Sequence, residues 1–169
     1  RLEEFVKAAA IVQDDTEIQF VFVGQGARKK GLQAQAESLG LKNLLFCDYQ
    51  PLEELSHSLS AADLHLVPLT AELSRCLMPS KLYGILAAGR PFLTNAPETS
   101  ELFEITKAHN VGYTVKAGLP SEIADAIRSA KNNRTTLQAM GQNARSLAEE
   151  QFTKTHSVAA FAKLLTEVV

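Results

Sequence analysis

Short runs of apolar residues, many of them β-branched or aromatic, recur along this chain and alternate with segments of helical periodicity. The runs lie at residues 18–23, 43–47, 63–68, 91–95 and 112–115. Each run is almost uniformly apolar, which is typical of strands that are covered on both faces. The intervening segments predict helices at residues 32–39, 51–61, 80–88 and 100–108. This alternation predicts an α/β fold with a doubly wound parallel sheet.

Beyond residue 115 the pattern predicts helices only, opening at Pro120 and continuing to the end of the chain. No repeat, low-complexity tract or linker interrupts it, so we expect residues 1–169 to form one domain. The chain begins at Arg1, without Met, inside an amphipathic pattern. We therefore expect it to be a piece of a longer protein.

The charge balance and the cysteines narrow the classes of partner. The chain has 17 basic and 19 acidic residues and no dense Lys/Arg block, so nucleic acid is not an expected partner. Cys47 and Cys76 lack the spacing of metal ligands and are expected to be buried thiols in a reducing compartment. No apolar run reaches the ~20 residues needed to cross a bilayer. We expect a cytoplasmic protein without a bound metal.

The segment from Met78 to Pro91 is the strongest candidate for a ligand site. Pro79 is suited to a helix entrance, and Ser80 is expected to cap the free amides there. Lys81 adds a positive charge in the first turn, and Gly89 is expected to end the helix. A phosphate group would fit this helix start.

Ligands of open α/β sheets bind at the carboxyl ends of the strands, which directs attention to two further loops. Gly24 and Gly26 allow close approach of a ligand, although a plain tight turn explains them equally well. Lys29 stands where a dinucleotide fingerprint needs its third glycine, so the pattern is weak support for NAD. Tyr49 and Gln50 could bracket a flat base, or could simply form a turn before the next helix.

Hydrolase chemistry is disfavoured. Ser56, His57 and Asp63 lie near one another in sequence, but no nucleophile-elbow pattern accompanies them. His65 falls inside a predicted strand and is interpreted as a satisfied core residue.

The order of these motifs resembles the C-terminal half of group-1 glycosyltransferases, which are retaining enzymes of the GT-B fold with two Rossmann-like domains. The resemblance covers essentially the whole chain and is carried by residues 20–26, 39–46, 61–68, 78–91, 112–113 and 140–145. The Pro-Ser-Lys-Leu variant at residues 79–82 is similar to the bacterial branch that assembles surface polysaccharides.

The resemblance implies a donor-binding domain for a nucleoside diphosphate sugar, used without a metal or other cofactor. It places Gly24 and Gly26 in the donor cleft, Tyr49 and Gln50 near the base, and Ser80 and Lys81 near the diphosphate. The other partner it implies is the N-terminal acceptor domain of the same protein. Peripheral association of that full-length protein with the inner membrane face also follows from this branch.

Two departures accompany the resemblance. Relatives carry two glutamates at positions that hold Cys76 and Gly84 here, so the donor ribose contact is unassigned; Glu72 lies nearby in sequence. Relatives also have a Gly-rich strand with a basic pair before the first helix, and this strand and the acceptor domain are absent. We therefore expect the 169-residue chain alone to be inactive in sugar transfer.

Two alternatives stay open at this point. One is a nucleotide-sugar epimerase of the same GT-B fold, which product analysis would separate because an epimerase needs no acceptor. The other is a non-catalytic relative that only binds a nucleotide or a partner. The loss of both glutamates is its main support.

Overall fold

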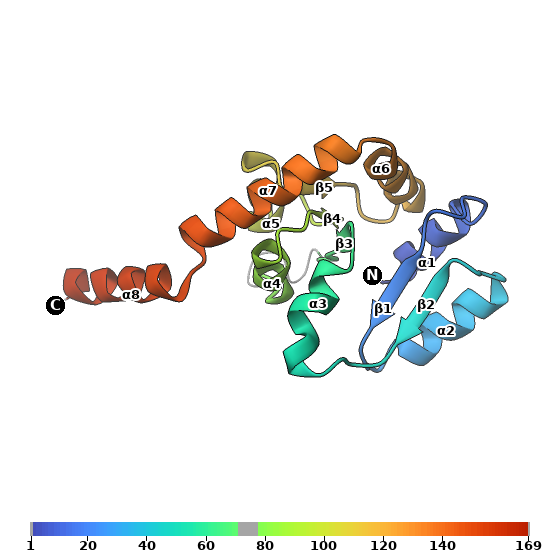
Figure 1. The fold of residues 1–169 in the computed structure, drawn as a ribbon, viewed down its shortest axis with the longest axis horizontal. Helices are drawn as coiled ribbons and strands as arrows, with labels where there is room; N and C mark the ends of the chain where they lie inside the picture. The colour runs from blue at the N-terminus through green and yellow to red at the C-terminus, as the bar shows by residue number, and fades with distance from the viewer. Residues whose placement is uncertain (1, 71–77, 169) are drawn as a thin grey trace.

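The computed structural model describes residues 2–70 and 78–168, in which helices surround a set of short parallel strands (Figure 1). The strands are β1 (Phe20–Val23), β2 (Leu44–Cys47), β3 (His65–Leu66), β4 (Phe92–Thr94) and β5 (Gly112–Thr114). The helices are α1 (Leu2–Ile11), α2 (Lys29–Ser38), the 3-10 turn η1 (Leu52–Glu54), α3 (Leu55–Ser60), α4 (Lys81–Ala87), α5 (Glu101–Ala108), α6 (Pro120–Asn132), α7 (Arg134–Gln151) and α8 (Lys154–Val168). The predicted α/β class, with parallel strands and C-terminal helices, is confirmed.

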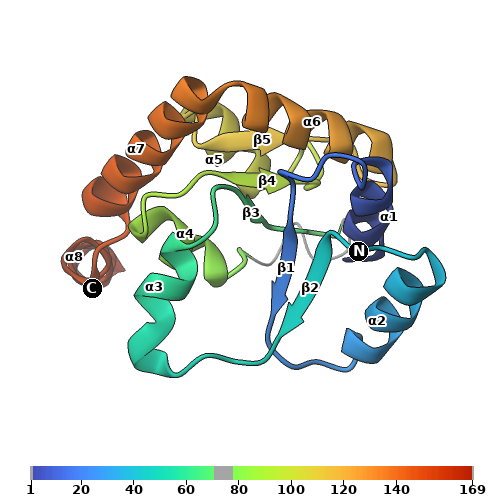
Figure 2. The ribbon, with the colours of Figure 1, turned by 45° about the vertical axis from the view of Figure 1, so that its right-hand side comes forward.

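The strands form two hydrogen-bonded groups, which Figure 2 shows from a second direction. β1 pairs with β2 in parallel, and β3, β4 and β5 pair in parallel in that order. No ladder joins β1 to β3 within the described residues. The predicted sheet is therefore interrupted at one place, between the edge of β1 and the edge of β3.

Helix α1 covers this interruption. Its residues Phe5 and Ala9 share one buried cluster with Phe20 of β1 and Leu93 of β4. Both groups of strands therefore pack on the same helix, although they share no backbone hydrogen bond. A second cluster lies on α4 and α7 and includes Phe92, so β4 is buried on both faces.

Two apolar surfaces are left uncovered. Val21, Val23 and Leu45 of the β1–β2 pair are all about half exposed. Helix α8 extends away from the rest of the domain in Figure 1 and exposes an apolar row along its length. That row consists of Val158, Phe161, Leu164 and Leu165.

Several local predictions can be compared directly with the structure. β3 has two residues instead of the predicted 63–68, and residues 51–61 divide into η1 and α3 after Pro51. The His65 Nε2 lies 2.8 Å from the Leu59 carbonyl oxygen, and burial lowers the pKa of this imidazole. The hydrogen bond confirms that His65 is satisfied, although its side chain is half-buried and does not lie fully in the core. Cys47 is a free thiol that is also half-buried, so the structure bears out its predicted burial only in part.

Within residues 2–70 and 78–168, none of the helices combines the length and the apolar character that a bilayer span requires.

Candidate functional site

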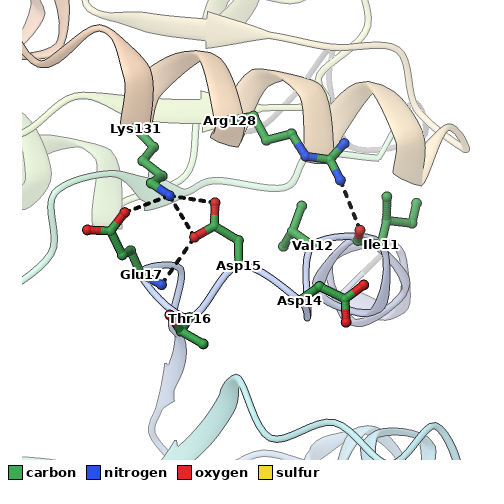
Figure 3. A pocket seen from close by; sticks show the side chains of 8 residues that line it. All are labelled: Ile11, Val12, Asp14, Asp15, Thr16, Glu17, Arg128 and Lys131. Carbon is green, nitrogen blue, oxygen red and sulfur yellow. Dashed lines mark hydrogen bonds and ion pairs between the residues drawn. The ribbon is translucent and has the colours of Figure 1, made fainter.

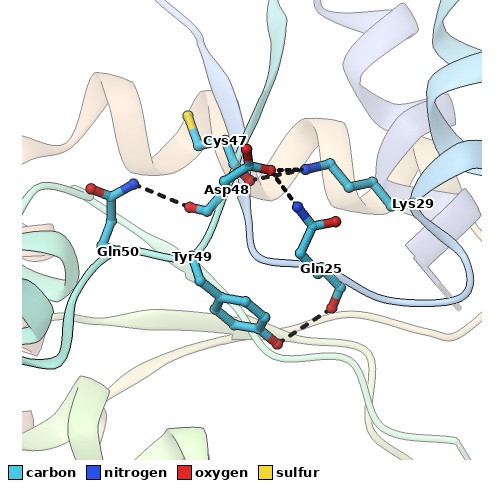
Figure 4. A network of polar contacts seen from close by, with 6 residues as sticks. All are labelled: Gln25, Lys29, Cys47, Asp48, Tyr49 and Gln50. Carbon is cyan, nitrogen blue, oxygen red and sulfur yellow. Dashed lines mark hydrogen bonds and ion pairs between the residues drawn. The ribbon is translucent and has the colours of Figure 1, made fainter.

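The loops after β1 and β2 meet at the carboxyl ends of these strands (Figure 4). Gly24 has a φ of 125°, a conformation that strongly favours glycine. A Cβ atom added to it would lie 3.0 Å from Cε1 of Tyr49, so the ring rests against the glycine backbone. The Tyr49 hydroxyl donates to the Gln25 carbonyl oxygen at 3.3 Å. The structure therefore brings together two predicted site residues, Gly24 and Tyr49.

An ion pair joins the same two loops. Asp48 Oδ1 accepts from Lys29 Nζ at 2.7 Å and from Gln25 Nε2 at 2.5 Å. The Lys29 side chain is only 18% exposed and also donates to the Cys47 carbonyl oxygen at 3.4 Å. Since both loops are anchored to one carboxylate, the position of the Tyr49 ring is fixed relative to Gly24.

The sequence interpretation missed this pair. In the sequence, Lys29 indicates only a departure from a glycine fingerprint, and no motif marks Asp48 as its partner. The available signal was a lysine and an aspartate, each a few residues beyond an apolar strand, at an edge where parallel strands end together.

The other predicted residues of this edge behave differently. Gln50 donates from Nε2 to the carbonyl oxygen of Asp48 at 3.1 Å, so its amide supports its own loop. Among residues 2–70 and 78–168, no heavy atom outside its chain neighbours lies within 4 Å of the position of a Cβ atom at Gly26, so the surface beside it is open there. The backbone at Gly26 is thus accessible to a ligand.

The start of α4 corrects one prediction. Ser80 has φ −58° and ψ −28°, which is already helical, and its side chain makes no capping hydrogen bond. A capping serine needs an extended backbone for its hydroxyl to reach the amides of the first turn. Here the turn begins one residue earlier, because the Leu82 amide donates to the Pro79 carbonyl oxygen at 2.9 Å.

Lys81 and Gly89 are placed as expected along α4. Lys81 is exposed in the first turn, and no ion-pair partner for it lies in the part of the chain that the structure describes. Gly89 has a φ of 64° and ends the helix. Ser80 and Lys81 follow β3 in the chain, whereas the Tyr49 loop follows β2, so these two parts of the predicted site lie on separate strand groups.

Position 84 has a structural explanation for its glycine. A Cβ atom at Gly84 would lie 3.1 Å from Cδ1 of Leu59, because α3 packs against this side of α4. A glutamate here would have to displace that leucine. The second position, Cys76, and the nearby Glu72 lie outside the described residues.

A separate hollow of about 530 Å³ lies at the opposite end of β1 (Figure 3). Its charged groups satisfy one another, because Lys131 Nζ lies 2.6 Å from Asp15 Oδ2 and 2.8 Å from Glu17 Oε2. The hydrogen bond from Lys131 holds the pKa of Asp15 below its ordinary value, and the two carboxylates raise the pKa of Lys131. Arg128 donates to the Ile11 carbonyl oxygen at 3.0 Å. The ion pairs in this hollow link α6 to the loop between α1 and β1.

The loops after β1 and β2 therefore offer the Tyr49 ring and accessible glycine backbone, and the start of α4 after β3 offers the charge of Lys81. These groups suit a flat base and a phosphate. Within residues 2–70 and 78–168, no three His, Cys, Asp or Glu side chains gather in a way that could hold a metal ion.

The parallel strands and the glycine and aromatic loops at their carboxyl ends define a domain of the Rossmann-like class. The model of the family described as glycosyl transferases group 1 matches residues 1–147, and the chain belongs to this family.

Individual relatives agree with this assignment. WcaI of Escherichia coli (strain K12), named for glycosyl transfer in colanic acid biosynthesis, is 35% identical over 104 residues, which are 62% of this chain and 25% of WcaI. Anabaena HepE with UDP-glucose superposes with a TM-score of 0.81 at 19% identity, over 98% of this chain and 44% of HepE. The C-terminal domain of LpcC from Francisella tularensis gives a TM-score of 0.74 at 17% identity, over 90% of this chain and 80% of that domain. The chain thus spans a quarter of WcaI and less than half of HepE.

Proposed function

We propose that this domain binds the donor, a nucleoside diphosphate sugar, in a glycosyltransferase that assembles a bacterial surface polysaccharide. The observation that carries the proposal is the Tyr49 ring, 70% exposed and held against Gly24 at the carboxyl edge. Family membership supports sugar transfer. The UDP-glucose bound to HepE, a protein of the same fold, supports a nucleotide-sugar donor.

In this proposal the base stacks on Tyr49 and the backbone of Gly24 and Gly26 lines the donor cleft. Gln50 lies beside the base. Ser80 and Lys81 face the diphosphate, where the lysine charge stabilises the phosphate oxygens. The ribose contact is without an assigned residue, because Leu59 lies close to Gly84.

The transfer reaction moves the sugar from the diphosphate to an acceptor hydroxyl with retention at the anomeric carbon. The bond to the diphosphate breaks, and negative charge develops on the departing phosphate near Lys81. A second domain of the longer protein holds the acceptor, so the 169-residue chain binds donor without transferring sugar. No metal or other cofactor takes part in this scheme.

The fold of the domain is completed by one more parallel strand between β1 and β3, supplied by the longer protein. A doubly wound sheet of this class has the strand order 3-2-1-4-5-6. In that order β2 and β1 correspond to strands 3 and 2, and β3, β4 and β5 correspond to strands 4, 5 and 6. Strand 1 of that order would lie between the free edges of β1 and β3. A strand there would lead directly into α1, which follows the right-handed crossover rule.

The free edges have the backbone groups that such a strand needs. The amides of Phe20 and Gly24 donate to the β2 side. Since hydrogen bonding in a parallel strand alternates between its two sides, the amides of Val21 and Val23 point to the free edge. On β3 the amides of residues 65 and 67 donate to the β4 side, which leaves that of Leu66 for the same gap.

The test is a calorimetric titration of the full-length protein with UDP, GDP and ADP, repeated with two pairs of variants. Tyr49→Ala should weaken binding of the preferred diphosphate about tenfold, since base–aromatic stacking contributes ~1–3 kcal/mol. Tyr83→Ala is its control, because Tyr83 packs against Phe152 away from this loop. Lys81→Ala should weaken binding more than Lys30→Ala does.

Indifference of the unmodified protein to all three diphosphates would contradict the proposed function. If all four variants bind the diphosphate equally well, the protein binds a nucleotide at a site other than the proposed one.

A further inference from the structure

A buried polar link lies beneath the carboxyl edge and has no role in the donor contacts described above. Asn95 follows β4 directly and is 1% exposed. Its Nδ2 donates to Glu4 Oε2 at 2.9 Å, and its Oδ1 accepts from the Leu69 amide at 3.3 Å. Glu4, in the first turn of α1, is 8% exposed.

The surroundings make this link costly unless every polar group in it is bonded. Leu69 and Ala96, on either strand exit, belong to the buried apolar core. Burying an amide without a hydrogen bond destabilises a protein, and burying an unpaired carboxylate destabilises it more. A buried Glu–Asn contact that joins α1 to β4 therefore fixes one arrangement of these segments.

The link continues the β3–β4 ladder where the backbone ladder stops. The last backbone bond of β3 to β4 runs from the Val67 amide to the Leu93 carbonyl oxygen at 2.9 Å. Two residues later the Leu69 amide has the Asn95 side chain as its acceptor. The side chain thus replaces a backbone carbonyl and sets the direction in which the chain leaves β3 at Leu69.

We propose that Asn95 and Glu4 are positioning residues for the donor: Asn95 holds the exit of β3, and Glu4 orients the Asn95 amide. This inference rests on the proposed function, because it concerns the exits of β3 and β4 at the carboxyl edge where the donor is placed. Neither side chain touches the donor in this scheme.

The test uses the full-length protein and a swap of donor and acceptor. Asn95→Asp removes the N–H that Glu4 accepts and sets two carboxylates against each other, while the Leu69 amide keeps an acceptor. Glu4→Gln alone keeps the bond, because the glutamine carbonyl still accepts from Asn95. In the double variant Glu4→Gln/Asn95→Asp, the glutamine amide donates to the new aspartate and restores the link with the polarity reversed.

The preferred diphosphate of the titration above is the probe, measured with the melting temperature of each variant. We expect Asn95→Asp to raise its Kd at least tenfold and the double variant to return it to within about threefold of the parent. Asn143→Asp, an equal charge change at an exposed asparagine that donates to the Asn110 carbonyl oxygen, is the matched control and should leave Kd unchanged.

A lowered melting temperature with unchanged Kd in Asn95→Asp would overturn the inference and show a structural role only. Failure of the double variant to recover Kd would overturn it as well. If the unmodified protein binds no diphosphate, the proposed function fails and this inference fails with it. If the unmodified protein binds and Asn95→Asp binds equally well, the inference alone fails.

Discussion

The two groups of strands are similar in sequence and different in surroundings. β1 is uniformly apolar and β4 has two apolar residues before Thr94, yet β4 is buried on both faces whereas Val21 of β1 is 51% exposed. β4 has a paired strand on each side, and β1 has one on one side only. The comparison shows that the apolar character of a short strand does not by itself decide how far the strand is buried, since the two strands differ in their paired neighbours.

The largest expected difference between the groups is in core stability. Leu93→Ala on β4 removes a fully buried side chain and should cost about 2–5 kcal/mol of unfolding free energy. Leu45→Ala on β2 removes the same atoms from a half-exposed site and should cost less than about 1 kcal/mol. Urea unfolding of the 169-residue chain measures both. Equal losses would show that the β1–β2 face is as well covered as β4.

The next difference concerns the free edges. In the 169-residue chain the amides of Val21, Val23 and Leu66 should exchange rapidly with deuterium, whereas the hydrogen-bonded amide of Gly24 should be protected. In the full-length protein the same three amides should slow by about a hundredfold or more, because a strand between β1 and β3 accepts from them. Unchanged exchange in the longer protein would contradict the sixth strand.

The smallest expected effect is in the ion pair that links the two groups through α6. The pKa of Asp15 is lowered from 3.8, so its contribution is present above that value and is lost as the pH falls through the lower folded-state pKa. Lys131→Met removes the pair and should flatten the stability profile over the acidic range. Thermal unfolding between about pH 5 and pH 3 would show this, with exposed Lys116→Met as the control. A profile as steep as that of the parent would exclude the pair as its source.

The sequence was sufficient where local chemistry decides the structure. The five strands and the end of α4 at Gly89 were predicted from apolar runs and a glycine, and both are local signals. Ser100 stands directly before α5, which suits a capping serine, and it accepts from the Phe103 amide at 3.2 Å. The predicted cap at Ser80 was wrong, because the choice between a cap and a first helical residue depends on the backbone that precedes it.

The polar contacts of the site required the fold. The Lys29–Asp48 pair is formed by residues 19 positions apart, and its geometry follows from the register of β1 on β2. The contact between Asn95 and Glu4 spans 91 positions and depends on where α1 crosses β4. No periodicity or motif encodes such pairs, because each partner alone reads as an ordinary loop or helix residue.

The exposed ring at Tyr49 has a practical consequence for optical measurements. The chain contains no Trp and three Tyr, so its near-ultraviolet absorbance and emission come mainly from three phenol rings. Tyr113 is half-buried and Tyr83, which packs edge-on against Phe152, is 40% exposed, whereas Tyr49 is 70% exposed. Quenching by an added solute such as acrylamide is therefore strongest at Tyr49, and its loss in Tyr49→Phe isolates the signal of this edge.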